Sequence, residues 1–207
     1  VRVECSAAWG QTRRQRTPDG TMRIFWSIAL VVLLFWLVAD GMARFRYKTP
    51  KAENRDRYSL VLIVVGNLVA WIIGISLAFR ATGALHSVAL QIAGLLVLLT
   101  GIALRSTAIM QLGRFHTPNV AILTDHQLMR TGLYRYVRHP SYLGALIAFL
   151  GLGMALDNWL SLVVIMGISL GIYIYRIHEE EQALSAAFGA VYRAYCLRTK
   201  RLIPGLY

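Results

Sequence analysis

Charged residues are scarce in this sequence, and acidic ones are the scarcest. Of its 207 residues, 15% are charged and 57% are hydrophobic, with 10 Asp or Glu against 22 Lys or Arg. This composition is not typical of a water-soluble domain. The basic excess alone would favour a nucleic-acid partner, but that function needs a basic face on a soluble module. Nucleic-acid binding is therefore excluded.

Cysteine and metal-ligand patterns are also lacking. Cys5 and Cys196 are the only cysteines, too few and too far apart for a disulfide framework or a thiolate metal site. His178-Glu179 begins like the zinc motif H-E-x-x-H, but residue 182 is Gln. The sequence predicts no metal site.

Long apolar runs without charge are what the sequence has in abundance. Five are present, each of 16 to 24 residues, close to the ~20 that cross a ~30 Å hydrocarbon core. They are residues 24–39, 58–79, 81–104, 139–156 and 158–175. Because open strands leave backbone groups unsatisfied in lipid, these runs should be helical. The sequence predicts an all-α integral membrane protein with about five transmembrane helices.

The basic residues indicate how these helices are oriented. With five crossings, the loops 40–57 and 105–138 and the C-terminal tail lie on one side and hold 16 of the 22 Lys and Arg residues. Loops rich in Lys and Arg stay in the cytoplasm, which places these three segments there. We therefore expect a cytoplasmic C-terminal region in a multi-pass protein of the plasma or inner membrane.

The N-terminal segment conflicts with this orientation, because it would lie outside with five basic residues. Residues 1–21 are polar, lack periodicity and are followed by Met22 directly before the first apolar run. N-terminal segments of this kind are often not part of the fold. We expect residues 1–21 to be a disordered or mis-assigned extension and residues 22–207 to form a single membrane domain.

The last two apolar runs should form a helical hairpin. We expect helices at about 24–39, 60–79, 88–105, 140–156 and 159–175, and an interfacial segment at 106–138. Pro140 suits the first turn of a helix, and Asp157-Asn158 turns the chain. Each arm should be about 27 Å long. The Arg138-to-Pro140 end and the Arg176-to-Glu181 end should therefore meet on the same face.

Two patterns within the apolar runs indicate helix packing. Asn67 in the second run favours an interhelical hydrogen bond over a ligand. Gly167 and Gly171 fit the nucleophile motif G-x-S-x-G, but Ser169 lies within a span and has no strand-to-helix turn. The same glycines fit G-x-x-x-G, so we expect close helix packing there.

Three adjacent carboxylates, Glu179, Glu180 and Glu181, follow the fifth apolar run, where a cytoplasmic helix end usually carries Lys or Arg. They repel one another, so a cation should compensate them. Arg176 can do so as an ordinary pair with Glu180 across one turn, worth a few tenths of a kcal/mol. A cationic ligand is the alternative, because aromatic ring faces attract such groups. The neighbouring rings are Tyr134, Tyr136, Tyr142, Tyr192 and Tyr195.

Two motifs at this cluster resemble those of a known family. The first is Gly132-Leu-Tyr-Arg-Tyr-Val-Arg-His-Pro-Ser-Tyr-Leu-Gly144. The second is Arg176-Ile-His-Glu-Glu-Glu-Gln-Ala-Leu184, followed by Phe188-Gly189, Tyr192, Tyr195 and Arg201-Leu-Ile-Pro204. Over roughly residues 94–204 the sequence resembles the isoprenylcysteine carboxyl methyltransferase family. Leu133 departs from the family, which commonly has proline there.

The resemblance implies a membrane methyltransferase that uses S-adenosylmethionine without a Rossmann fold. Cofactor binding would fall to Tyr134, Arg138, His139, Pro140, Tyr142, Gly144, Glu180 and Glu181. Catalysis would fall to Glu180, Glu181 and Arg176, with Arg176 beside the acceptor carboxylate. Glu and Tyr suit the two cationic groups of this cofactor, and Arg or a helix N-terminus suits its carboxylate.

The methyl acceptor stays open at this point. In the namesake family it is the carboxylate of a prenylated cysteine, whose lipid tail would enter from the bilayer. Phospholipid-type amine methylation is the alternative, and it would need a base such as Glu181 or His139. A non-enzymatic membrane scaffold, in which the carboxylates only cap the hairpin, is the second alternative. The oligomeric state is not predicted.

Overall fold

The structure is a computed structural model that describes residues 20–46, 58–80, 83–115 and 128–203. Apart from two isolated β-bridges, the regular elements of this part of the chain are helices. They are α1 (Gly20–Arg46), α2 (Tyr58–Phe79), α3 (Val88–Leu112), η1 (Gly113–Phe115), η2 (Gly132–Arg135), α4 (Pro140–Ala155), α5 (Trp159–Phe188) and α6 (Ala190–Arg198). The expectation of an all-α membrane protein is confirmed.

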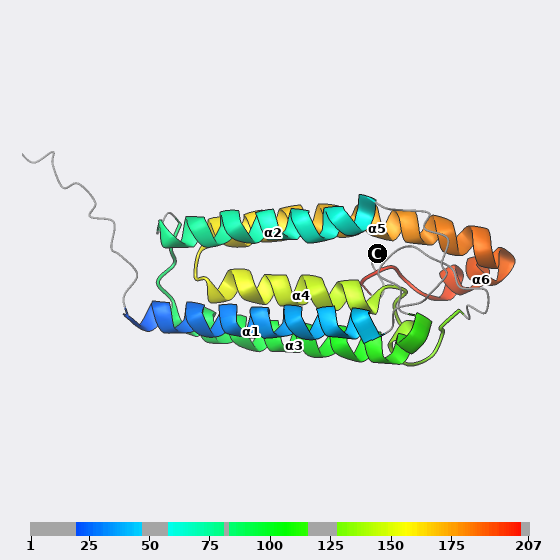
Figure 1. Ribbon diagram of the computed structural model, residues 1–207, viewed down its shortest axis with the longest axis horizontal. Coiled ribbons are helices and arrows are strands. Elements are labelled where there is room, and N and C mark those ends of the chain that lie inside the picture. Colours follow the sequence, from blue (N-terminus) through cyan, green and yellow to red (C-terminus); the bar gives the residue numbers. More distant parts are fainter. Residues whose placement is uncertain (1–19, 47–57, 81–82, 116–127, 204–207) are drawn as a thin grey trace, which may run out of the picture.

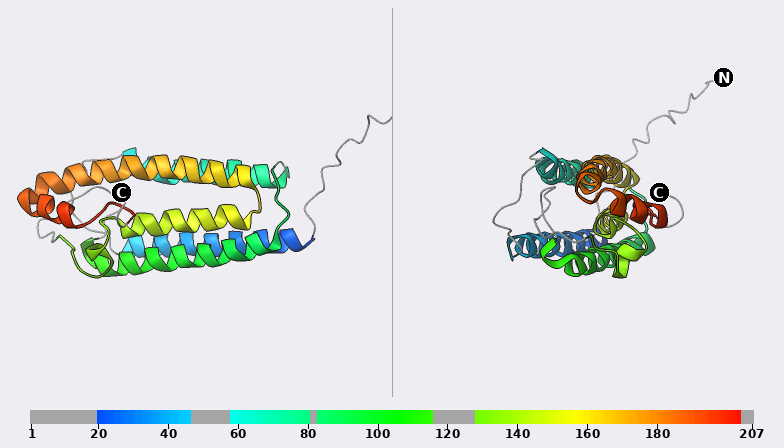
Figure 2. Two further views of the ribbon diagram at one scale, coloured as in Figure 1. Left: turned by 180° about the vertical axis from the view of Figure 1, so that it is seen from behind. Right: turned by 90° about the vertical axis from the view of Figure 1, so that its right-hand side faces the viewer.

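The long helices form two layers around a shorter one. Figures 1 and 2 show α2 beside α5 in one layer, α1 beside α3 in the other, and α4 between them. Helices α1, α2, α3 and α5 are long and apolar enough to cross a membrane, whereas α4 has 16 residues. At 1.5 Å per residue α4 is about 24 Å long, less than a full hydrocarbon core. Five crossings therefore stay a prediction.

Several helices extend beyond the expected bounds. The third ends at Leu112 rather than near Arg105, and the fifth runs to Phe188 rather than to Tyr175. Our predicted ends were therefore wrong there, because they followed the loss of hydropathy. A helix continues past the apolar segment wherever other elements pack against it. The proposed extension 1–21 lies largely outside the described residues.

Glycines set the close approach of α3 and α4. A Cβ on Gly101 would lie 2.2 Å from the backbone N of Ala148, and one on Gly144 would lie 2.5 Å from that of Arg105. Gly94 and Gly151 meet in the same way seven residues away. Backbone atoms cannot give way as side chains can, so these positions require glycine. This contact fixes the position of α4 along the axis of α3.

The contact between α2 and α5 includes the expected polar pair. Ser169 donates through its hydroxyl to Asn67 Oδ1 at 2.7 Å, inside the bundle, which confirms the hydrogen bond predicted for Asn67. The prediction of close packing at Gly167 and Gly171 was wrong within this chain. A Cβ on either would meet no atom within 4 Å, because both glycines face outward from α5.

One aromatic ring joins four helices at the centre of the bundle. The ring centroid of Phe149 on α4 lies 5.9 Å from Trp36 on α1, 5.3 Å from Trp71 on α2 and 6.3 Å from Tyr173 on α5. Tyr173 in turn lies 5.2 Å from Tyr142, in the first turn of α4. The core therefore reaches from the middle of the bundle to the end where the predicted motifs lie.

Candidate active site

The C-terminal tail folds back onto the start of α4. The amide of Arg138 donates to the carbonyl of Lys200 at 2.8 Å, and the amide of His139 donates to that of Arg201 at 3.1 Å. Helix α5 continues past α4 toward the same end of the bundle, and α6 returns along it (Figure 1). The two motifs, some 40 residues apart in sequence, therefore meet as predicted.

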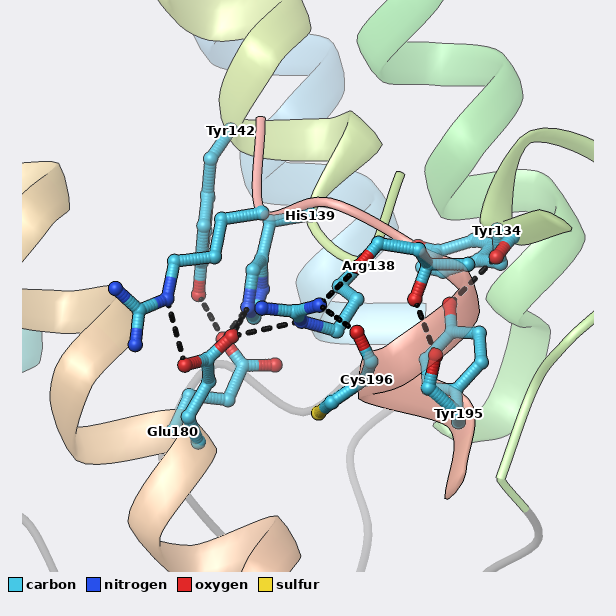
Figure 3. A network of polar contacts seen from close by, with 10 residues as sticks. Tyr134, Arg138, His139, Tyr142, Glu180, Tyr195 and Cys196 are labelled. Atoms are coloured by element: carbon cyan, nitrogen blue, oxygen red, sulfur yellow. Dashed lines mark hydrogen bonds and ion pairs between the residues drawn. The ribbon is translucent and has the colours of Figure 1, made fainter. Parts of the chain in front are cut away.

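Glu181 is the centre of a nearly buried ion cluster. Its Oε1 accepts from Arg138 Nε at 2.9 Å, and its Oε2 accepts from Arg201 Nε at 2.8 Å. The side chains of Glu181 and Arg138 are only 12% and 10% exposed. Arg138 also donates to the carbonyls of Cys196 and Thr199 (Figure 3). Both oxygens of Glu181 are thus engaged, and the residue ties the tail to the start of α4.

Glu180 has a different environment from its neighbour. Its Oε2 accepts from the Tyr142 hydroxyl at 2.7 Å, and its side chain is 31% exposed. Among the described residues its Oε1 makes no hydrogen bond or ion pair. Arg176 Nε donates to the Tyr142 hydroxyl at 3.2 Å. The hydroxyl of Tyr142 therefore links a buried guanidinium to a carboxylate that a ligand can reach.

His139 lies between the two carboxylates. Its Nε2 is 3.4 Å from Glu181 Oε1, and its Nδ1 is 3.8 Å from Glu180 Oε2. The imidazole is buried and stacks on the ring of Tyr142 at 5.6 Å between centroids. Figure 3 shows these side chains gathered around the Glu180 carboxylate. The start of α4, with His139 as its N-cap and Tyr142 in its first turn, therefore presents both rings to the carboxylates of α5.

Tyr134 lies apart from this cluster (Figure 3). Its hydroxyl donates to the carbonyl of Ala108 on α3 at 3.3 Å, and its own carbonyl accepts from the Tyr195 hydroxyl at 2.5 Å. Burial raises the pKa of the Tyr134 hydroxyl and raises that of Tyr195 to about 12. Both hydroxyls therefore stay protonated near neutral pH. They hold η2 between α3 and α6 rather than facing the carboxylates.

Pro140 and Gly144 shape the backbone at the site. Pro140 occupies the first turn of α4, where the missing N–H costs nothing. Gly144 faces the backbone of α3, as described above, and so points away from α5. The structure therefore brings together six of the residues expected at the site, whereas Tyr134, Pro140 and Gly144 contact the neighbouring backbone instead. The six are Arg138, His139, Tyr142, Arg176, Glu180 and Glu181.

Two other arginines, for which the sequence predicted no role, form ion pairs. Arg201 reaches Glu181, as described, and only its place in the Arg201-Leu-Ile-Pro204 motif pointed to it. Arg105 pairs with Asp40 on α1 at 3.1 Å inside the bundle, with both side chains under 8% exposed. Asp40 directly follows an apolar run, where a charged residue usually marks the end of a transmembrane segment, so the sequence did not indicate this pair.

Known proteins are similar to this chain over the part that forms the site. Residues 92–186 match the family model described as the isoprenylcysteine carboxyl methyltransferase (ICMT) family. This segment is similar to the ICMT family. The resemblance stated from the two motifs is thereby confirmed. A methyltransferase family implies S-adenosylmethionine as the methyl donor.

Curated relatives cover a similar part of the chain. A protein-S-isoprenylcysteine O-methyltransferase of Schizosaccharomyces pombe is 37% identical over 116 residues, 55% of this chain and 49% of its own length. Protein-S-isoprenylcysteine O-methyltransferase B of Arabidopsis thaliana is 34% identical over 113 residues, 54% of this chain and 57% of its own length. The chain thus spans about half the length of the curated relatives it matches.

A solved structure extends the likeness in fold to almost the whole chain. The structure of the eukaryotic intramembrane Ras methyltransferase ICMT matches with a TM-score of 0.67 and 23% identity, over 93% of this chain and 70% of that one. At this identity the match concerns the fold alone. The fold of the chain, outside as well as inside the segment that matches the family model, is therefore similar to that of this solved structure.

Proposed function

We propose that this protein transfers a methyl group from S-adenosylmethionine to the carboxylate of an isoprenylcysteine-like amphiphile. The observation that carries the proposal is the chain Arg176–Tyr142–Glu180, in which one hydroxyl joins a buried guanidinium to a reachable carboxylate. Such an arrangement offers an anion site and a cation site side by side. A methyl donor with cationic groups and an acceptor carboxylate need that pair.

The residues at this site fit the methyl donor. When bound, S-adenosylmethionine supplies an electrophilic methyl group on a positively charged sulfur. Glu180 would hold a cationic part of it, since its Oε1 has no partner among the described residues. The buried Tyr192 hydroxyl also lacks a hydrogen-bond partner in that part of the chain and stands near Glu181 and Arg138. A polar ligand would satisfy both groups.

Arg176 would orient the acceptor. Its guanidinium is buried and already donates to Tyr142, so it can meet a carboxylate in a place from which water is largely excluded. Holding two reactants in line supplies much of a methyl transfer rate, without a covalent intermediate. The acceptor's lipid tail would lie in the bilayer between helices.

The environment of the two candidate bases supports a carboxylate acceptor over an amine. An amine must lose a proton, which requires a general base. Glu181 is held by two guanidinium groups, which favour its ionised, weakly basic form. Each ring nitrogen of His139 faces a carboxylate oxygen, at 3.4 Å and 3.8 Å, so neither nitrogen is turned toward an acceptor amine. A carboxylate acceptor needs neither residue as a base.

The test is methyl incorporation into membrane extracts. Membranes from cells that produce the protein are incubated with methyl-labelled S-adenosylmethionine, and the lipid fraction is then treated with alkali. We expect label that alkali releases, because esters are cleaved and methylamines are not. Label that resists alkali would indicate amine methylation instead, and no label above background would support the scaffold alternative.

We place the methyltransferase domain at residues 22–207, with the site on the cytoplasmic side of the plasma or inner membrane. The 16 Lys and Arg residues on that side support this orientation.

A further inference from the structure

We propose that Asp40, on α1, is a positioning residue for the site. It acts through Arg105, on α3, which holds the first turn of α4. This inference rests on the proposed function, because it assigns Asp40 a purpose in methyl-donor binding. Asp40 lies outside the segment that matches the family model. Its importance comes from an ion pair inside the bundle.

The Arg105 guanidinium is held on three sides. Its Nε and Nη2 each donate to a different oxygen of Asp40 at 3.1 Å. Its Cζ lies 5.7 Å from the ring centroid of Trp36, one helical turn before Asp40 on the same face of α1. The third nitrogen, Nη1, donates to the carbonyl of Ser141 at 3.3 Å. All three nitrogens are used, so the planar fork of arginine is required.

The contact with Ser141 reaches the site directly. Ser141 lies between Pro140 and Tyr142, and Gly144 in the next turn lies against the Arg105 backbone. The first turn of α4 is therefore fixed to α3 by backbone contact and by the Arg105 side chain together. That turn carries Tyr142, whose hydroxyl bonds Glu180.

A bare packing role does not explain a charged pair here. Asp and Arg within membrane helices are costly and rare, and they mark sites where the protein uses them. The α2–α5 contact of this bundle is joined without charge, by the bond from Ser169 to Asn67. An ion pair with a bidentate geometry fixes direction as well as distance. Asp40 therefore sets the direction in which Arg105 points, and so the position of Ser141.

The test compares Asp40→Asn and Asp40→Glu with the control Ser169→Ala in purified full-length protein. The control removes a buried interhelical hydrogen bond that does not touch α4. Two quantities are measured for each variant below its unfolding temperature: hydrogen exchange of peptides covering residues 139–145 without ligand, and S-adenosylmethionine affinity by titration calorimetry. Asp40→Glu keeps the charge but moves the carboxylate. It therefore tests whether the orientation of the Arg105 guanidinium matters even if Asp40→Asn does not fold.

We expect both Asp40 variants to raise exchange in residues 139–145 about tenfold or more, since local opening precedes exchange. Donor affinity should fall about ten- to hundredfold, as it does when a ligand-orienting group is lost at metal sites. Ser169→Ala should change neither quantity. Unchanged exchange and affinity in both Asp40 variants would overturn the proposal. If Glu180→Gln leaves donor affinity unchanged, the proposed donor site is wrong, and the ligand-free exchange still decides the role of Asp40.

Discussion

The two adjacent carboxylates of α5, Glu180 and Glu181, should differ in what the same substitution to Gln changes: ligand affinity for the first and stability for the second. Glu180→Gln keeps the shape and the bond from Tyr142 but removes the charge, so it should weaken methyl-donor binding. A charge-assisted hydrogen bond contributes about 1.5–3 kcal/mol, and partial exposure reduces this to about 1–2 kcal/mol here. The side chain is 31% exposed. Donor affinity should therefore fall about 5- to 30-fold, while the unfolding temperature stays close to that of the wild type.

Glu181→Gln should instead act on stability. It leaves the guanidinium of Arg138, only 10% exposed, without its carboxylate partner. Breaking a buried pair costs about 3–5 kcal/mol, and we take about 3 because Arg201, the other partner, is 37% exposed. At about 2–4 °C per kcal/mol, the unfolding temperature should fall by roughly 6–12 °C. The C-terminal tail would then separate more readily from the start of α4.

Titration calorimetry and thermal unfolding of both variants, in the same detergent, test this division. The reasoning is refuted if Glu181→Gln keeps the native unfolding temperature and Glu180→Gln keeps the native donor affinity. A loss of affinity in Glu181→Gln with unchanged stability would reverse the roles we assign.

Four further outcomes follow from the geometry. Arg176→Lys should lower turnover about tenfold while changing donor affinity less, because Lys keeps the charge but loses the fork that meets Tyr142 and a carboxylate; steady-state kinetics beside calorimetry checks this. Gly144→Ala should cost about 1–3 kcal/mol of unfolding free energy, since its Cβ would meet α3 backbone, and thermal unfolding measures it. Unfolding free energy should fall as pH rises from about 10 toward about 12, because the Tyr195 hydroxyl keeps its proton to a higher pH in the folded state than in the unfolded state. Tyr195→Phe should make the unfolding free energy, measured from denaturation curves, depend less on pH in this range. Leu197→Cys, 89% exposed on α6 and placed in a background without native cysteines, should react with an impermeant thiol reagent only after cells are opened.

Sequence patterns predicted the meeting of the two motifs because a helical hairpin leaves little choice. Two helices joined by Asp157-Asn158 must return to one end, so Arg138 and Glu181 had to lie close. The pairing of Asn67 was predictable for a similar reason, since a lone amide in an apolar run needs a partner. Such inferences depend on period and length, which the sequence contains.

Other features could not be predicted, because they depend on which helix faces which. The separation of Glu180 from Glu181 arises from the tail, where Arg201 reaches only the second carboxylate. The Asp40–Arg105 pair joins residues 65 apart on helices whose rotation no local pattern fixes. The exposure of Gly167 and Gly171 likewise depends on what covers α5.

The central claim is that an acceptor carboxylate is methylated at this site. Its most direct test offers the purified protein an N-acetyl-S-prenylcysteine and, in parallel, the same compound with its carboxylate replaced by a carboxamide, with S-adenosylmethionine in excess. Mass spectrometry should show one added methyl on the acid, as an alkali-labile ester, and none on the amide. Glu180→Gln should slow the formation of this ester. An unmodified acid, together with methylation of an amine-bearing phospholipid under the same conditions, would contradict the account.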